Sequence, residues 1–208
     1  MMDNDIILEP RSLDILLVSI PRLSVEVPPL SIAQFKPSLA KAGFKSQCMD
    51  LNIELYHEFK FEEWLEIDNY FQTDLRYTGN DTSGVQREIN FEAMHENKKK
   101  GLQVFEKYMD FLNRWVDIML AKRPTWIGIS VFSVNSVLPS IDLCSVIRKK
   151  SPNTKIMLGG MGVSAFGVAT RPNFGEYMRS VGLADEYISG EGENAIVKLL
   201  KEKRSIQV

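Results

Sequence analysis

The feature that most limits the fold of this chain is an apolar run of strand length at residues 14–20, which ends at Pro21. It is almost continuously apolar, whereas a strand with one face in water alternates between apolar and polar residues. Continuous apolar strands are typical of parallel sheets, which are buried on both faces. Four further strand-like segments follow, at residues 45–51, 126–131, 155–158 and 186–189.

Helical segments alternate with these strands. The first helix is predicted to open at Pro28 and Pro29 and to run to about Ala42, with Gly43 as its stop. Pro37 lies inside this helix, which is therefore kinked or begins later. Other helices are predicted over residues 137–150, 174–182 and 194–203. The alternation predicts an α/β fold: a doubly wound, flavodoxin-like, five-stranded parallel sheet in the order 2-1-3-4-5.

The composition changes between the second and third strands. Residues 53–123 contain no proline and hold 12 of the 20 aromatic residues. Helices are predicted over residues 59–77 and 88–122, with a polar turn at 78–84. We therefore expect a helical insertion at 53–123, and a Rossmann-like domain formed by residues 1–52 and 124–208. The aromatic residues either build the core of the insertion or present a surface for a substrate or partner.

Charge and composition exclude several classes of protein. The net charge of −2 gives no electrostatic attraction to nucleic acid or an anionic membrane. No apolar run approaches the roughly 20 residues that span a bilayer. The acidic first nine residues lack the basic start of a secretory signal. Cys48 and Cys144 are too few for a disulfide framework or a cysteine-rich metal site. We expect a cytoplasmic protein.

Ligands of open α/β sheets bind outside the carboxyl ends of the strands. The loops after three neighbouring strands are rich in glycine and small hydroxyl residues, which let a ligand approach the backbone closely. The alternative is that these glycines only turn the chain, and that Glu193 stabilises the start of the last helix. The candidate residues in these loops are Ser130, Phe132, Ser133, Gly159, Gly160, Met161, Gly190, Glu191, Gly192 and Glu193.

Common catalytic and nucleotide-binding motifs do not fit. Residues 160–165 formally match the dinucleotide fingerprint, but they follow the fourth strand instead of the first, and Asp185 opens the next strand instead of closing it. There is no P-loop and no Gly-x-Ser-x-Gly motif. His57 and His95 both fall in the insertion, where we expect surface or packing roles rather than metal binding.

An ordered set of motifs resembles a known family, the N-terminal cobalamin-binding domain of B12-dependent radical SAM enzymes. The resemblance covers residues 14–52 and 125–203, and the glycine-rich strand ends are its most specific part. The motifs are Pro28-Pro29-Leu30, residues 39–43, residues 49–52, residues 127–130, residues 156–160 with Gly159-Gly160, and residues 187–193 with Gly190-Glu191-Gly192-Glu193.

The resemblance implies cobalamin as the cofactor. In the family the corrin ring lies over the carboxyl edge of the sheet, and the nucleotide tail enters a slot that needs small and hydrogen-bonding residues. The first loop would approach the lower corrin face. This adds Pro21, Leu23, Ser24 and Val25 to the ten candidate residues of the other loops.

Two departures from related proteins refine this expectation. B12 carriers with a histidine ligand to cobalt have Asp-x-His-x-x-Gly after the first strand, whereas residues 21–27 contain no histidine. We therefore expect base-off binding without a protein histidine, and Leu23, Ser24 or Val25 facing cobalt. The three-cysteine motif of radical SAM enzymes is also missing, so a [4Fe–4S] cluster and S-adenosylmethionine would require a separate or missing radical SAM domain.

The chain is thus predicted to be the N-terminal part or the partner of such an enzyme, of the methyltransferase type, and not to be catalytic by itself. Two alternatives stay open. One is a flavodoxin-like domain that binds a flavin or nucleotide, although residues 21–28 are poor in Ser, Thr and Gly for a phosphate. The other is an α/β protein-interaction module that uses the aromatic insertion.

Overall fold

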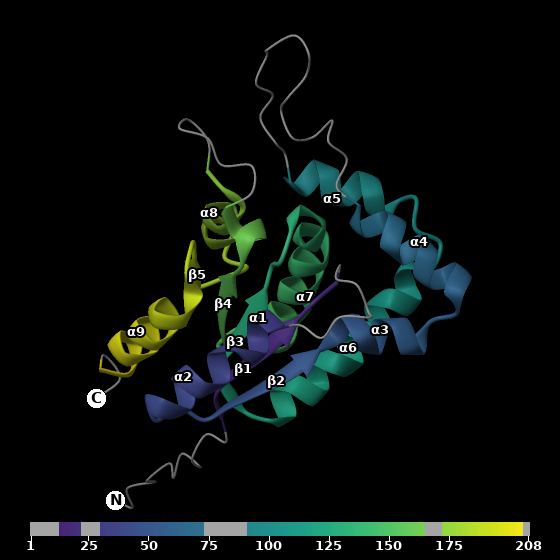
Figure 1. Ribbon diagram of the computed structural model, residues 1–208. Coiled ribbons are helices and arrows are strands. Elements are labelled where there is room, and N and C mark those ends of the chain that lie inside the picture. The colour runs from purple at the N-terminus through teal and green to yellow at the C-terminus, as the bar shows by residue number, and fades with distance from the viewer. Residues whose placement is uncertain (1–12, 22–29, 73–90, 165–171, 206–208) are drawn as a thin grey trace, which may run out of the picture.

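The computed structural model describes residues 13–21, 30–72, 91–164 and 172–205 (Figure 1). The five strands pair in parallel in the order β2-β1-β3-β4-β5, as the sequence predicts. Their bounds are β1 (Leu13–Ser19), β2 (Ser46–Asp50), β3 (Pro124–Ser130), β4 (Lys155–Gly159) and β5 (Glu186–Ile188).

The described helices follow the predicted alternation of strand and helix. They are α1 (Leu30–Ala33), α2 (Phe35–Lys41), α3 (Leu51–Glu58), α4 (Phe61–Phe71), α5 (Phe91–Lys99), α6 (Phe105–Ala121), α7 (Val137–Lys150), α8 (Phe174–Ser180) and α9 (Gly192–Ser205). Two 3-10 turns, η2 (Val134–Ser136) and η3 (Met161–Ser164), follow β3 and β4.

The helical stretch predicted to run to about Ala42 is interrupted at Gln34, which divides it into α1 and α2. Pro37 lies in the first turn of α2, where a backbone N–H has no acceptor within the helix, so the missing donor costs little. Of the two options for Pro37, the structure favours the kink, because Gln34 keeps helical dihedral angles between the two pieces. The last helix begins at Gly192, two residues earlier than predicted.

The insertion differs in part from the prediction: the helix expected at 59–77 corresponds to α4, with residues 73–77 outside the described part of the chain, and α3 was not predicted. α3 ends at Glu58, and α4 starts at Phe61, where the Glu63 carboxylate accepts the Lys60 N–H at 3.0 Å. The predicted helix at 88–122 is two helices, α5 and α6, with Gly101 between them. The Asp50 side chain caps α3 directly after β2 by accepting the N–H groups of Asn52 and Ile53.

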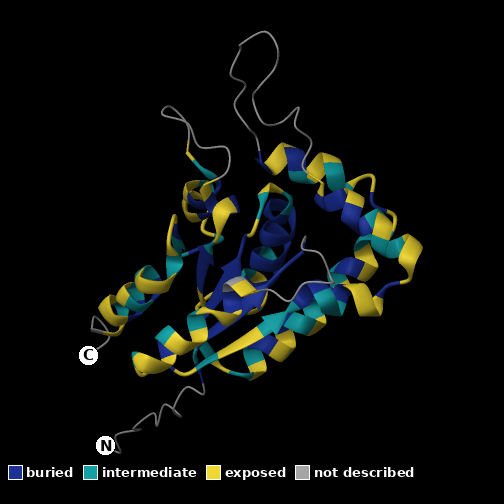
Figure 2. Ribbon diagram, in the orientation of Figure 1, coloured by how far each residue is buried: buried dark blue, intermediate teal, exposed yellow. Residues whose placement is uncertain are grey.

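The two faces of the sheet carry separate apolar cores. Leu16, Val18 and Ile129 belong to a core shared with α3, α4, α6, α7 and α8. Ile15, Leu17 and residues on β3, β4 and β5 belong to a second core shared with α1, α2 and α9. Figure 2 shows the central strands buried between these layers, whereas the edge strand β2 is intermediate or exposed. This two-sided burial explains why β1 is almost continuously apolar.

A buried carboxylate joins the insertion to the sheet domain, in addition to the apolar core that the two share. Asp142 on α7 is 1% exposed. Its Oδ2 accepts the Tyr70 hydroxyl of α4 at 2.9 Å, and its Oδ1 lies 2.6 Å from Nε2 of His95 on α5. Burial, and then the charge of Asp142, raise the pKa of Tyr70, so this phenol remains a donor. Three elements far apart in the sequence therefore meet at Asp142.

Replacing Asp142 by Asn should lower the free energy of unfolding by about 2–4 kcal/mol, because the amide presents N–H groups where the carboxylate accepts. Urea denaturation measures this difference. Asp117→Asn is the matched control: its exposed carboxylate pairs with Lys150 on the surface, so a change within about 0.5 kcal/mol is expected. Equal effects of the two substitutions would contradict the proposed attachment.

A second, partly buried charge cluster fixes the opposite edge of the sheet. Arg148, in the last turn of α7, donates to Asp185 Oδ2 at 2.6 Å and to the carbonyls of Gly182 and Thr154. The Ile156 N–H at the start of β4 donates to the same carboxylate at 2.8 Å. Burial alone would raise the pKa of Asp185, but the hydrogen bonds from Arg148, Ile156 and Lys155 outweigh it and hold the pKa below its ordinary value.

Because the pKa of Asp185 is lower in the folded chain than in the unfolded one, its stabilising effect is present above about pH 4 and is lost as the pH falls through the folded-state value. Asp185→Asn should therefore reduce the free energy of unfolding by about 2 kcal/mol at pH 7. The difference from wild type should shrink below about pH 4. Urea titrations at several pH values test this; an equal difference at pH 7 and pH 3 would contradict it.

Candidate functional site

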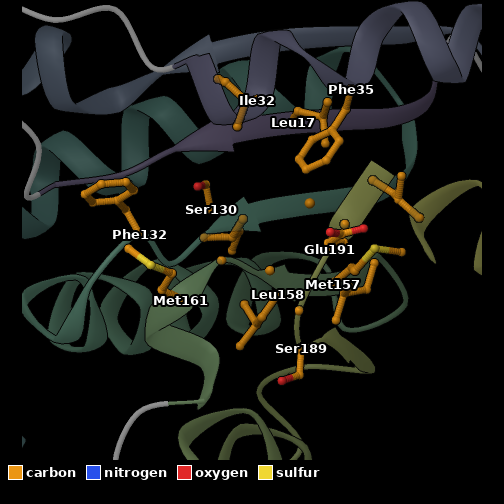
Figure 3. Close-up of a pocket in the computed structure, with 18 of the residues that line it drawn as sticks. Leu17, Ile32, Phe35, Ser130, Phe132, Met157, Leu158, Met161, Ser189 and Glu191 are labelled. Atoms are coloured by element: carbon orange, nitrogen blue, oxygen red, sulfur yellow. The ribbon is translucent and has the colours of Figure 1, made fainter. Parts of the chain in front are cut away.

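A cavity of about 780 Å³ lies at the carboxyl ends of β3 and β4, on the face of the sheet that packs against α1, α2 and α9 (Figure 3). This is the edge where ligands bind in doubly wound sheets. The lining residues come from four strands, from the loops that follow them, and from three helices. They are Leu17, Ile32, Gln34, Phe35, Gly128, Ile129, Ser130, Phe132, Met157, Leu158, Gly159, Gly160, Met161, Ser164, Ile188, Ser189, Gly190, Glu191, Gly192 and Ile196.

The floor of the cavity is open above Gly159 on β4, which is paired with Ser130 on β3. Gly128 on β3 also lines the cavity, but a Cβ there would lie 3.0 Å from Cδ2 of Leu17, so the Leu17 side chain occupies that space. A Cβ atom at Gly159 would meet no atom within 4 Å, and its φ angle is not in the left-handed region. Neither packing nor the backbone therefore requires glycine at 159, whose small size leaves space above the sheet.

The glycines of the loop after β4 have a different role. Gly160 has a φ of +107°, and a Cβ there would lie 2.5 Å from the Val131 carbonyl oxygen. The Gly162 N–H donates to this same oxygen at 2.9 Å, and a Cβ at Gly162 would lie 2.5 Å from the backbone carbonyl oxygen of Ser133. The alternative that glycines only shape the chain thus accounts for these two positions, where two loops pack backbone against backbone.

The side walls are apolar. Ile32 and Phe35 come from α1 and α2, while Ile188 and Ile196 come from β5 and α9. A Cβ at Gly192 would lie 2.9 Å from Cζ of Phe35, so the start of α9 approaches α2 closely. Phe132 and Met161 stand at the opposite end from Phe35, as Figure 3 shows. Met161 is 72% exposed, so this end of the cavity opens to solvent.

The polar groups of the cavity are mainly hydroxyls. Ser130 lies on the sheet, and the hydroxyl oxygens of Ser164 and Ser189 are 2.6 Å apart. Glu191 is the one ionisable side chain among the described lining residues, and none of these is a lysine, arginine or histidine. Such a lining favours an uncharged ligand group with a broad apolar surface and a few hydrogen-bonding atoms over a bare phosphate.

Eight of the fourteen candidate residues from the sequence line this cavity: Ser130, Phe132, Gly159, Gly160, Met161, Gly190, Glu191 and Gly192. Three described candidates do not. The Ser133 hydroxyl accepts the Asn135 N–H and caps η2, Glu193 lies in the first turn of α9, and Pro21 is buried at the end of β1. Leu23, Ser24 and Val25 lie outside the described residues.

Sequence reasoning missed the strand and helix residues of the cavity. Among them are Leu17, Gly128 and Met157 on the sheet and Phe35 and Ile196 on the helices. One available signal was the alternation along β3, where Gly128 and Ser130 share a face and are both small. The large apolar residues gave no signal, because an apolar side chain that lines a cavity has the same sequence pattern as one that fills a core.

Comparisons with protein families, curated proteins and solved structures find no match to this chain. In the part of the chain that the structure describes, no helix is both long and apolar enough to cross a membrane. Within the same residues no three His, Cys, Asp or Glu side chains are grouped to hold a metal ion. Cys48 is exposed on β2, whereas Cys144 is buried in α7.

The two kinds of glycine predict different responses to a methyl group. Gly160→Ala should lower the free energy of unfolding by roughly 2–4 kcal/mol, because the methyl meets a backbone oxygen and φ is left-handed. Gly159→Ala should leave stability unchanged or raise it by about 0.5 kcal/mol, because alanine is the better strand residue and its Cβ enters open space. Thermal unfolding compares the two; a comparable loss in both variants would contradict this distinction.

Proposed function

We propose that this chain is a cobalamin-binding domain and that it acts as the N-terminal part or the partner of a B12-dependent radical SAM enzyme of the methyltransferase type. The observation that carries the proposal is the glycine-floored apolar cavity at the carboxyl edge of the sheet. Its volume of about 780 Å³ lies within the range of roughly 300–1,000 Å³ usual for small-molecule sites.

The lining suits the nucleotide tail of cobalamin. The tail ends in a flat aromatic base, which would pack on apolar walls such as Phe35 and Met157 while Ser164 and Ser189 offer hydrogen bonds. The Gly159 position leaves room for this base directly above the sheet. When bound, cobalamin would supply the cobalt-centred chemistry, and this chain would bind, orient and shield it.

The exposed rim suits the corrin ring. Phe132 and Met161 extend from the loops after β3 and β4, and the turn at Gly190 follows β5 with a φ of +91°. All three lie at the edge where the ring would cover the end of the slot. An exposed phenylalanine and methionine are costly in water, and an apolar macrocycle would cover them.

The two histidines of the chain support a base-off state without a protein ligand to cobalt. His57 lies on α3, and His95 on α5 is engaged with Asp142. Neither lines the cavity. We therefore expect Leu23, Ser24 or Val25 beneath cobalt, which leaves the lower side open or filled by water. A [4Fe–4S] cluster and S-adenosylmethionine would come from a separate or missing radical SAM domain.

The two alternatives differ in what they require of the cavity. A flavin mononucleotide or dinucleotide would bring about two phosphate charges, whereas the phosphodiester of the cobalamin tail brings one; the described lining residues offer no cation, so the flavin fits less well. A protein-interaction module would leave the cavity without a small ligand.

Titration with hydroxocobalamin, followed by gel filtration and a visible spectrum, tests the proposal. We expect corrin to co-elute with the protein and to show a base-off spectrum. A spectrum that indicates a nitrogen ligand below cobalt would support cobalamin as the cofactor. It would contradict the expectation that Leu23, Ser24 or Val25 lies beneath cobalt. Absence of bound corrin at tens of micromolar, from protein shown to be folded, would overturn the proposal.

Gly159→Leu should block the slot without disturbing the fold, because a side chain at this position extends into open space. We expect the affinity for hydroxocobalamin to fall at least about tenfold, since a tail excluded from the cavity loses most of its buried area. Gly101→Leu is the matched control: this exposed glycine lies in the insertion, and a Cβ there is 3.7 Å from its nearest neighbour. Equal affinity of the two variants would show that the cavity does not hold the cofactor.

A further inference from the structure

An exposed aromatic surface lies on the insertion, where α3 meets α4. We define it as Tyr56, Phe61, Trp64 and Leu65, and call it the α3–α4 aromatic surface. Phe61 is 62% exposed, Tyr56 40% and Leu65 39%. Large apolar side chains that cluster on a surface mark interaction sites, whereas single ones are ordinary.

The rings of this surface hold one another in place. Trp64 makes an edge-to-face contact with Tyr56, with ring centroids 5.6 Å apart and an interplanar angle of 87°. Phe61 stacks on the other side of Trp64, at 6.2 Å and 17°. Leu65 follows Phe61 by four residues and so continues its side of α4. A preorganised set of rings loses little conformational entropy when a partner binds, which is characteristic of interface anchors.

The surroundings of this surface carry a net negative charge. Residues 51–71, which contain α3 and α4, include six acidic residues, of which Asp68 is buried, and one basic residue, Lys60. Glu58 and Glu63 are neutralised by ion pairs with Arg114 and Lys107 of α6. Within the described part of the chain, Glu54 and Glu62 form no ion pair. Acidic side chains next to exposed aromatic rings favour a basic and apolar partner.

We infer that the α3–α4 aromatic surface docks a protein partner through a basic amphipathic segment, in which Lys or Arg flanks apolar residues. The acidic side chains would repel an anionic membrane and nucleic acid. A symmetric contact between two copies would place the same acidic surface against itself, which is unfavourable. Charge complementarity therefore selects a different chain as the occupant.

This surface is independent of the cavity. α3 and α4 belong to the layer on one face of the sheet, and the cavity opens on the other face beneath α1, α2 and α9. Figure 1 shows α3 and α4 on the opposite side of the molecule from α9. A partner on α3 and α4 would thus leave the cavity accessible, and the inference does not depend on cobalamin binding.

The test uses two labelled amphipathic helical peptides of equal length. One is built from Leu and Lys, and in the other every Lys is replaced by Glu. Fluorescence anisotropy measures their binding to the full chain. We expect the Lys peptide to bind at micromolar concentration, more weakly as salt rises, and the Glu peptide to bind at least about tenfold more weakly. Equal binding of both peptides, or no binding of the Lys peptide at 1 mM, roughly the weak limit of specific affinity, would overturn the inference.

Variants locate the contact. Phe61→Ser and Leu65→Ser remove exposed side chains and should each lower the affinity for the Lys peptide at least about fivefold, while Glu62→Lys should lower it by charge repulsion. Val181→Ser is the matched control: Val181 is a comparably exposed apolar residue beyond α8, and this variant should bind the Lys peptide with wild-type affinity. Unchanged binding in all variants would contradict the site. Concentration-dependent dimerisation that Phe61→Ser abolishes would show that a second copy is the occupant, which would also overturn the inference.

Discussion

The burial of α7 from every side is the constraint on which most of this structure depends. Ten of its 14 residues are buried, in contrast to an ordinary surface helix, which hides one stripe. The sheet covers one side of α7, and helices α4 and α6 of the insertion cover another. The insertion is therefore a second layer over α7, and its apolar residues continue the core of the sheet. Asp142 lies on α7, where its carboxylate requires the donors that the insertion supplies.

α7 also joins the parts of the molecule that have different roles. The turn before it carries Phe132 and the cap at Ser133, and so shapes the rim of the cavity. Its middle carries Asp142, and its last turn carries Arg148, which fixes Asp185 at the far edge of the sheet. One rigid helix thus connects the rim, the insertion and the base of β4 and β5.

Much of the fold was predictable from local patterns, because strand order in a doubly wound sheet follows from alternation and from the length of the connections. The loop residues at the carboxyl edge were predictable for the same reason. The contact of Asp142 with Tyr70 and His95 was not, since it joins residues far apart in the sequence with no shared motif. The cavity walls were not predictable either, because Leu17, Ile32 and Ile196 have the pattern of core residues.

The glycines show that a sequence motif says less about the role of a residue than the space around that residue does. Gly159 and Gly160 are neighbours in one glycine pair, yet a Cβ would enter open space at the first and meet a carbonyl oxygen at the second. Gly159 leaves space above the sheet, and Gly160 makes the turn possible. The described lining of the cavity has no cation, and Glu191 is its one ionisable side chain, so volume and shape would dominate the selection of any ligand. Side-chain size at position 159 is therefore the property of this cavity that most directly limits what it can hold.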